Sequence, residues 1–320
     1  MGETRETGDE SAGVSPSRRS GRERVHLGDA SVILRWAALT HEGLVRASNQ
    51  DTFGAAGGVF VVCDGMGGHM GGGRASEIAA GVVTAVSQHG APTIQSLVAT
   101  VEAANIAILD ESRTDPHLDG MGTTLVALSL AENGGSPTWV ALNVGDSRLY
   151  VADDEGPRQL SVDHSVVQEL IDGGSIAADE VAGHPERHVV TRALGSELAP
   201  AADVWLMPPV AGAHFLLTTD GAHGDVDEAD LIAALTNDDP VASCDALLRA
   251  ALATGGRDNI TALCVVVDDV VPDAADAIDE STTPRVGRSP VAMLGSEPPE
   301  GALITSVPIG RSALSNGELA

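Results

Sequence analysis

Lysine is absent from this 320-residue chain, and all 18 of its basic residues are arginine. A P-loop nucleotide site, a Schiff-base enzyme and a protein kinase each need a lysine at a defined place in the site. None of these three classes can therefore be built here in its standard form.

Aromatic residues and positive charge are also scarce. Three Trp, three Phe and one Tyr leave the core to Val, Leu, Ile and Ala. So few aromatics disfavour stacking on nucleic-acid bases. The net charge of −28 opposes binding to nucleic acids and to anionic membranes. We therefore expect no nucleic-acid and no membrane partner, whereas the many carboxylates suit divalent cations.

Cysteines are few, and long apolar runs are missing. Cys63, Cys244 and Cys264 are widely spaced and form no Cys-x-x-Cys pair, which argues against a disulfide framework or a structural zinc site. No run reaches the roughly 18 apolar residues of a membrane span. These features predict a soluble protein of the reducing cytoplasm.

Composition divides the chain into three parts. Residues 1–30 carry Ser, Gly, Glu and Arg with almost no apolar content, which predicts a disordered N-terminal arm. Residues 269–320 are acidic and then rich in Pro, Ser and Gly, which predicts a disordered tail. The folded domain is expected over residues 31–268.

Within that domain, strand and helix patterns are mixed. Strands are predicted at residues 32–39, 58–64, 122–130, 138–144, 147–152, 203–207, 213–219 and 260–268. Helical patterns lie at 74–88, 93–110, 163–172 and 228–253, and residues 173–195 are irregular. Turn signals at Asn133–Gly135 and Gly145–Ser147 make adjacent strands antiparallel. The sequence predicts an α+β fold of layered antiparallel sheets with helices outside.

An apolar run from Val59 to Cys63 delivers Asp64 into a glycine-rich turn. A carboxylate at the end of a buried strand is half desolvated, which is costly unless a cation or a donor meets it. We interpret Asp64 as a metal ligand. The alternative is an ordinary strand-to-helix turn in which Asp64 caps the helix.

Three more aspartates sit beside glycines at the ends of apolar runs: Asp119, Asp220 and Asp258. Hard oxygen ligands without clustered His or Cys suit magnesium or manganese, and carboxylates converging from several strand ends are typical of a two-metal centre. Such a centre activates water for attack on phosphorus. Arg46, in a polar loop, offers the forked cation that a phosphate needs.

In this order the motifs resemble a bacterial metal-dependent serine/threonine protein phosphatase of the type 2C, or PPM, family. The resemblance spans nearly the whole expected domain. It rests on residues 46–51 (RASNQD), 64–69 (DGMGGH), 120–124 (GMGTT), 143–148 (NVGDSR), 163–165 (DHS), 192–195 (RALG), 219–221 (TDG) and 256–261 (GRDNIT).

The resemblance implies a four-layer αββα sandwich, two antiparallel sheets flanked by helix pairs, with two manganese or magnesium ions at one end. Asp64 would bridge both ions, the Gly65 carbonyl would bind one, and Asp220 and Asp258 would hold the other. Asp119 would help to bind a third, weaker ion. Arg46 would clamp the phosphate. The substrates would be proteins phosphorylated on serine or threonine by a bacterial kinase, and we expect a monomer.

Some positions depart from the family pattern. Met66 stands where eukaryotic members place a histidine thought to protonate the leaving group, so His69 or a metal-bound water must substitute. Gly224 replaces an aspartate after Asp220. The neighbouring His223 is either a surface residue without a role, which we favour, or a local adjustment near the metals. Asp146, in a hairpin turn next to Arg148, is interpreted as structural. The alternative is that its carboxylate reaches a buried arginine or orders the metal site.

Two other functions remain open at this point. One is a catalytically weak pseudophosphatase that binds phosphoproteins as a regulator. The other is a noncatalytic divalent-cation sensor, which the acidity and the departures after Asp220 would favour.

Overall fold

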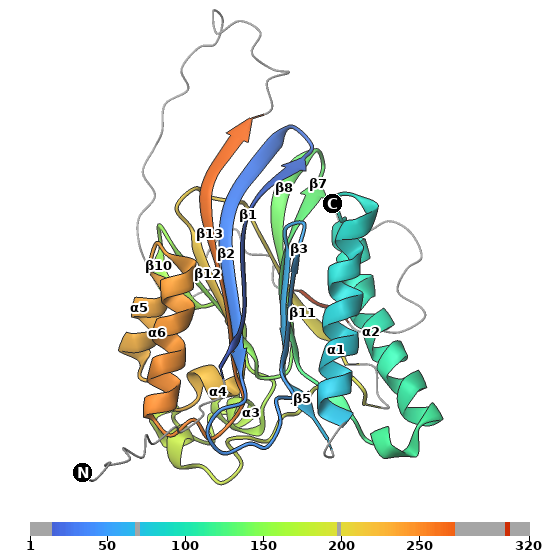
Figure 1. Ribbon diagram of the computed structural model, residues 1–320, viewed down its shortest axis with the longest axis vertical. Helices are drawn as coiled ribbons and strands as arrows, with labels where there is room; N and C mark the ends of the chain where they lie inside the picture. The colour runs from blue at the N-terminus through green and yellow to red at the C-terminus, as the bar shows by residue number, and fades with distance from the viewer. Residues whose placement is uncertain (1–14, 68–70, 197–199, 273–304, 308–320) are drawn as a thin grey trace, which may run out of the picture.

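The computed structural model describes residues 15–67, 71–196, 200–272 and 305–307. Two six-stranded sheets lie face to face, with a pair of helices outside each, so that the molecule has four layers (Figure 1). Neighbouring strands in both sheets are antiparallel. The predicted α+β sandwich of antiparallel sheets is confirmed.

The first sheet holds, in spatial order, β1 (Ser17–Leu27), β2 (Ala30–His41), β13 (Ile260–Pro272), β12 (His214–Thr218), β9 (Arg148–Asp153) and β10 (Gly156–Gln159). The second holds β14 (Thr305–Val307), β11 (Ala202–Met207), β8 (Ser136–Val144), β7 (Leu125–Asn133), β4 (Val59–Cys63) and β3 (Thr52–Ala56). A short ribbon pairs β5 (Gly65–Met66) with β6 (Gly122–Thr123).

The helices follow the apolar stripes of the sequence. The second sheet is covered by α1 (Gly71–Ala85) and α2 (Ile94–Thr114), and the first by α5 (Glu228–Leu235) and α6 (Pro240–Ala253). Two shorter helices, α3 (Val166–Asp172) and α4 (Asp220–His223), and 3₁₀ turns at Val86–His89, Pro116–Leu118 and Ala178–Gly183 complete the described elements. The stretch predicted as helical over 228–253 is two helices, because Asp239 and Pro240 cap and start a new one.

Alternation along the strands builds the core on both faces of each sheet. In β4, Val59, Val61 and Cys63 pack among the residues under α1 and α2, whereas Phe60 and Val62 point between the sheets. All five side chains of β4 are fully buried. Burial on both faces explains why this strand is continuously apolar and why Asp64 emerges at its end.

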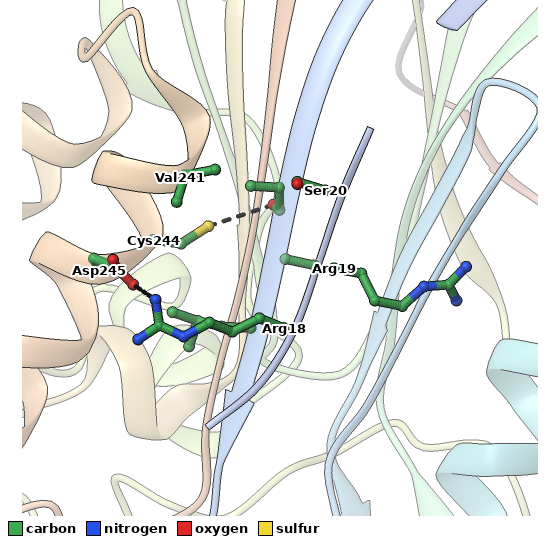
Figure 2. A pocket seen from close by; sticks show the side chains of 9 residues that line it. Arg18, Arg19, Ser20, Val241, Cys244 and Asp245 are labelled. Atoms are coloured by element: carbon green, nitrogen blue, oxygen red, sulfur yellow. Dashed lines mark hydrogen bonds and ion pairs between the residues drawn. The ribbon is translucent and has the colours of Figure 1, made fainter. Parts of the chain in front are cut away.

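The N-terminal boundary of the domain was predicted wrongly. Residues 17–27 form β1, which pairs with β2 over its whole length, so this part of the arm expected to be disordered belongs to the first sheet. Arg18 reaches Asp245 on α6, while Arg19 points to the other side of the strand (Figure 2). The sequence did not predict β1 because most of its own residues are polar. The apolar residues that its backbone pairs with belong to β2.

The C-terminal boundary also differs from the prediction. β13 continues to Pro272, and Thr305–Val307 pair with β11 at the edge of the second sheet. The predicted tail therefore begins too early at residue 269. The rest of it, like residues 1–14, lies outside the described residues.

Cys63, Cys244 and Cys264 are free and buried. No helix within the described ranges is both long and apolar enough to cross a membrane.

Candidate metal centre

Five aspartates converge at one end of the sandwich, from the ends of different strands. Asp51 precedes β3, Asp64 follows β4, Asp146 lies in the β8–β9 turn, Asp220 follows β12, and Asp258 precedes β13. The labels of α4 and β5 mark this end in Figure 1. The convergence of Asp64, Asp220 and Asp258 from distant strand ends is what their sequence positions predicted.

The negative charges of this cluster act on one another. The pKa of Asp64 is raised well above its usual value, first by burial and then by the charges of Asp51, Asp220, Asp146 and Asp258. Burial and the charge of Asp258 raise the pKa of Asp220, and a hydrogen bond with Asp64 partly offsets that rise. Two carboxyl groups at hydrogen-bond distance must share a proton or a cation, because two bare carboxylates repel each other.

Asp51 is the most deeply buried member of the cluster. Its Oδ2 atom accepts hydrogen bonds from the hydroxyl groups of Thr261 at 2.7 Å and Thr219 at 2.9 Å. Burial nevertheless raises the pKa of its carboxyl group to about 7, and the charges of Asp220 and Asp258 add to the rise. Asp51 therefore belongs to the same electrostatic unit as the predicted ligands.

Asp146 is also buried, and Arg148 does not neutralise it. The guanidinium of Arg148 instead binds both carboxylate oxygens of Asp163, at 2.6 to 3.0 Å. Burial raises the pKa of Asp146 to about 7, and the charges of Asp220 and Asp163 reinforce the rise. Asp146 thus faces the acidic cluster more than an ordinary turn aspartate would.

The donor set fits a hard divalent cation. Asp51 Oδ1 and Asp220 Oδ1 are buried and accept no hydrogen bond within the described part of the chain. An unsatisfied buried oxygen is costly unless a cation or a water meets it. No three His, Cys, Asp or Glu side chains in the described ranges are already spaced around a single ion. Magnesium usually keeps several waters beside one or two carboxylate ligands.

The glycine turn and the GMGTT motif fix the backbone of Asp64. Its carbonyl accepts hydrogen bonds from the Thr124 N–H at 2.9 Å and the Thr123 hydroxyl at 2.8 Å, and its N–H donates to Thr124 Oγ1 at 2.9 Å. A Cβ atom on Gly65 would lie 2.1 Å from the carbonyl oxygen of Gly72. Only glycine therefore fits at the position whose carbonyl the family resemblance assigns to a metal.

Arg46 lies beside the cluster. Its Nη2 atom donates to Asp258 Oδ2 at 2.6 Å, and this hydrogen bond is the main reason why the pKa of Arg46 is raised. Asn259 anchors the loop that carries Arg46, because its Nδ2 atom donates to the carbonyls of Glu42 and Ser48, both at 3.0 Å. The cation predicted to clamp a phosphate is thus held next to a predicted metal ligand.

Asp119 is exposed, just after the 3₁₀ turn Pro116–Leu118. The following residue packs on the glycine turn, since a Cβ atom on Gly67 would lie 2.6 Å from the carbonyl oxygen of Gly120. This contact places the Asp119 loop near Asp64. His69, the candidate proton donor, lies outside the described residues.

The irregular stretch 173–195 reaches the cluster. His188 Nδ1 lies 3.9 Å from Asp220 Oδ2, and the His188 side chain is largely exposed. Arg192 donates to Asp203 Oδ1 at 3.2 Å, which holds the end of the stretch against β11. A substrate approaching Asp220 would therefore meet this stretch.

His223 is not the surface residue that the sequence suggested. It is buried, its Nδ1 atom lies 2.9 Å from Thr218 Oγ1, and its ring packs edge-on against Tyr150. Burial lowers the pKa of this imidazole well below its usual value, so the ring is neutral. His223 supports α4, the helix on which Asp220 is the first residue.

Sequence reasoning missed Asp51 and Asn259 as functional positions. Both lie within motifs that were recognised, and each directly precedes a strand, as the predicted ligand Asp258 nearly does. Their shared position just before a strand was the feature of the sequence that could have marked both residues as functional. Nothing local to Asp51 showed that Thr219, directly after β12, and Thr261, on β13, would hold its carboxylate.

A family model described as protein phosphatase 2C matches residues 44–260. The chain is 37% identical over 248 residues to the serine/threonine protein phosphatase PstP of Mycobacterium tuberculosis, covering 75% of this chain and 46% of PstP. It therefore spans about half the length of that relative. It is 34% identical over 242 residues to the serine/threonine phosphatase stp of Listeria innocua, covering 71% and 93%.

Solved structures agree with these relatives. The crystal structure of M. tuberculosis PstP/Ppp has a TM-score of 0.68 at 34% identity and covers 74% of this chain and 99% of that one. The catalytic domain of PstP in complex with two manganese ions has a TM-score of 0.66, with the same identity and coverage. The carboxylate cluster thus lies in a fold already known to hold such ions, and the chain belongs to the protein phosphatase 2C family.

Proposed function

We propose that this chain is a metal-dependent phosphatase that hydrolyses phosphoserine and phosphothreonine in proteins. The observation that carries the proposal is the cluster of mutually repelling carboxylates, with buried unsatisfied oxygens on Asp51 and Asp220, beside the guanidinium of Arg46. Names of the relatives support the substrate class, since both are serine/threonine phosphatases.

Asp64, the Gly65 carbonyl, Asp220 and Asp258 would hold two manganese or magnesium ions, and Asp119 would help with a third, weaker one. Ions at such a site supply Lewis acidity and an activated water for attack on phosphorus. The backbone bonds from Thr123 and Thr124 keep Asp64 in one orientation, so little reorganisation is needed when charge builds up.

Arg46 would orient the phosphoryl group. Its planar guanidinium matches the geometry of phosphate oxygens, and its loop is fixed by Asn259. The carboxylate of Asp258, which accepts a hydrogen bond from Arg46, would bind the metal ion instead. Arg46 would then be available to the substrate while staying at the edge of the cluster.

The partners would be proteins phosphorylated by a serine/threonine kinase, and the chain would act as a monomer. Three free, buried cysteines suit a reducing compartment such as the cytoplasm.

Replacing Asp64 or Asp220 by Asn tests the proposal. Each substitution removes one charge from the cluster with little change in volume, and manganese-dependent release of phosphate from a phosphothreonine peptide should fall on the order of 1000-fold. Asp110→Asn is the matched control, because Asp110 is exposed on α2 and pairs only with Arg113 in the described structure.

Turnover near the wild-type level in Asp64→Asn would refute the proposal. Calorimetry on the wild-type protein separates the other functions. Tight manganese binding without any phosphate release would indicate a cation sensor. Binding of the phosphopeptide in the presence of a chelator, again without turnover, would indicate a pseudophosphatase regulator.

A further inference from the structure

Two large apolar side chains stand exposed directly before Arg46. The exposed fractions of Leu44 and Val45 are 65% and 68%, the highest among the exposed large hydrophobic residues of the described structure. A single exposed leucine needs no explanation. Two adjacent ones, next to a residue expected to bind phosphate, mark a contact surface.

The backbone under these side chains is tied down. The Leu44 N–H donates to the Gly256 carbonyl at 2.7 Å. Gly43 has a φ of 81°, and a Cβ atom there would lie 2.2 Å from the carbonyl oxygen of Asp258. With Asn259 holding Glu42 and Ser48, the loop is fixed on both sides of Leu44. The two side chains are therefore held out to solvent on a rigid support, which lowers the entropy lost when a ligand binds.

The exposed pair is continuous with the proposed active site. Arg46 follows Val45 directly and bonds Asp258 at 2.6 Å. A further exposed apolar residue, Val189, follows His188, which approaches Asp220 at 3.9 Å from the stretch 173–195. Apolar side chains from two separate segments thus accompany a cluster that is otherwise acidic.

We infer that Leu44 and Val45 form an apolar shelf that binds an apolar side chain next to the phosphorylated residue of the substrate. The favoured substrates are then phosphoprotein segments with Leu, Ile, Val or Met beside the phosphoserine or phosphothreonine. Burying such a side chain on the shelf removes apolar surface of both partners from water. The inference rests on the proposed phosphatase function and names the substrate class of that site.

Three substrates test the shelf in the presence of manganese. Two are phosphothreonine peptides of equal net charge that carry either Leu or Ser on both sides of the phosphothreonine. The third is p-nitrophenyl phosphate, which has no flanking residue. The wild-type protein should hydrolyse the Leu peptide with a kcat/KM about tenfold above that of the Ser peptide, and the difference should lie in KM.

The double variant Leu44→Ser with Val45→Ser should bring the ratio of the two peptides to within about twofold of one. Serine is neutral, so the field at the phosphate is unchanged. Leu44→Ile with Val45→Ile should retain the preference. Val241→Ser is the matched control, since Val241 is 42% exposed on α6, and it should keep the wild-type ratio.

A wild-type ratio near one, or an unchanged ratio in the double serine variant, would overturn the shelf. An equal loss on all three substrates would also overturn it, because that result indicates damage to the site and not lost recognition. Failure of the proposed function looks different: the wild-type protein would release no phosphate from either peptide. Turnover of both peptides at equal kcat/KM would refute the shelf and leave the proposed phosphatase function standing.

Discussion

Asp51 shows how the burial of a single carboxyl group makes the stability of the fold depend on pH. Its carboxyl group is buried, bonded to two threonine hydroxyls, and has a pKa of about 7. An unfolded aspartate titrates near 4. Between those two values the folded chain keeps a proton that the unfolded chain has lost, so the free energy of unfolding falls as the pH rises.

Asp51→Asn should remove the contribution of Asp51 to this pH dependence from the metal-free protein, while Asp64, Asp146 and Asp220, whose pKa values are also raised, still contribute. The quantity to compare is the free energy of unfolding of the variant minus that of the wild type, with a chelator present. This difference should be about 2 to 4 kcal/mol larger at pH 8 than at pH 5. Urea unfolding at both pH values measures the difference. The neutral imidazole of His223 acts with the opposite sign below its unfolded pKa, but it is common to both proteins and cancels. A stability difference that is the same at pH 5 and pH 8 would contradict the expectation.

At the residue scale, the sequence predicted which carboxylates meet in the cluster better than it predicted their neighbours. Asp64, Asp220 and Asp258 could be identified because a carboxylate at a strand end beside glycine is a local pattern. The partner of Arg148 could not, since Asp163 lies 15 residues away and reaches Arg148 only through the fold. The burial of His223 was missed for the same reason, because its cover comes from Tyr150 on β9.

Among the elements, β1 connects the two sheets. Glu23 accepts a hydrogen bond from Trp36 Nε1 on β2 at 3.0 Å and another from the Gly58 N–H, in the β3–β4 turn of the second sheet, at 2.9 Å. Leu27 at the end of β1 is buried in the core between the sheets. An element that looks like a polar arm in the sequence therefore closes one edge of the sandwich.

Removing β1 should destabilise the domain. A chain that begins at Asp29 should lose about 3 to 6 kcal/mol relative to one that begins at Ser15, because it loses the burial of Leu27 and both bonds of Glu23. It also exposes the edge of β2 to pairing with other chains. Thermal and urea denaturation measure the loss, and light scattering reports association. Equal stability of the two chains would show that β1 is dispensable.

The predicted strands and helices were recovered where one sequence segment carries its own apolar pattern. The long helices α1 and α2 and the central strands β4 and β8 are of this kind. The edge strand β1 is not, because its ladder and its buried neighbours belong to β2. An edge strand such as β1 is stabilised by its neighbour in the sheet. Composition alone therefore predicts that such a segment is disordered.

The whole molecule combines a charge of −28 with a cluster of carboxylates that repel one another. A bound divalent cation would relieve this repulsion only in the folded state, because the ligands come from strand ends that are distant in sequence. Metal binding is therefore coupled to the stability of the whole domain.

Manganese should raise the midpoint of thermal unfolding by about 5 to 10 °C when it is present at roughly 100 times its dissociation constant. The rise should be larger at pH 8 than at pH 5.5, where protons compete for carboxyl groups whose pKa values are raised. Sodium chloride at equal ionic strength is the control for simple screening, and excess chelator should reverse the effect. No shift in the midpoint would argue against metal binding by the folded chain.

The arginines of β1 have one more consequence. With lysine absent, trypsin can cleave this chain only after arginine, and four of its 18 arginines lie in β1. A protease must draw its target out into an extended, unpaired conformation, which these residues cannot adopt while β1 is paired with β2. Tryptic cleavage after Arg18, Arg19, Arg22 or Arg24 therefore reports whether this edge of the sandwich has opened, independently of events at the metal centre.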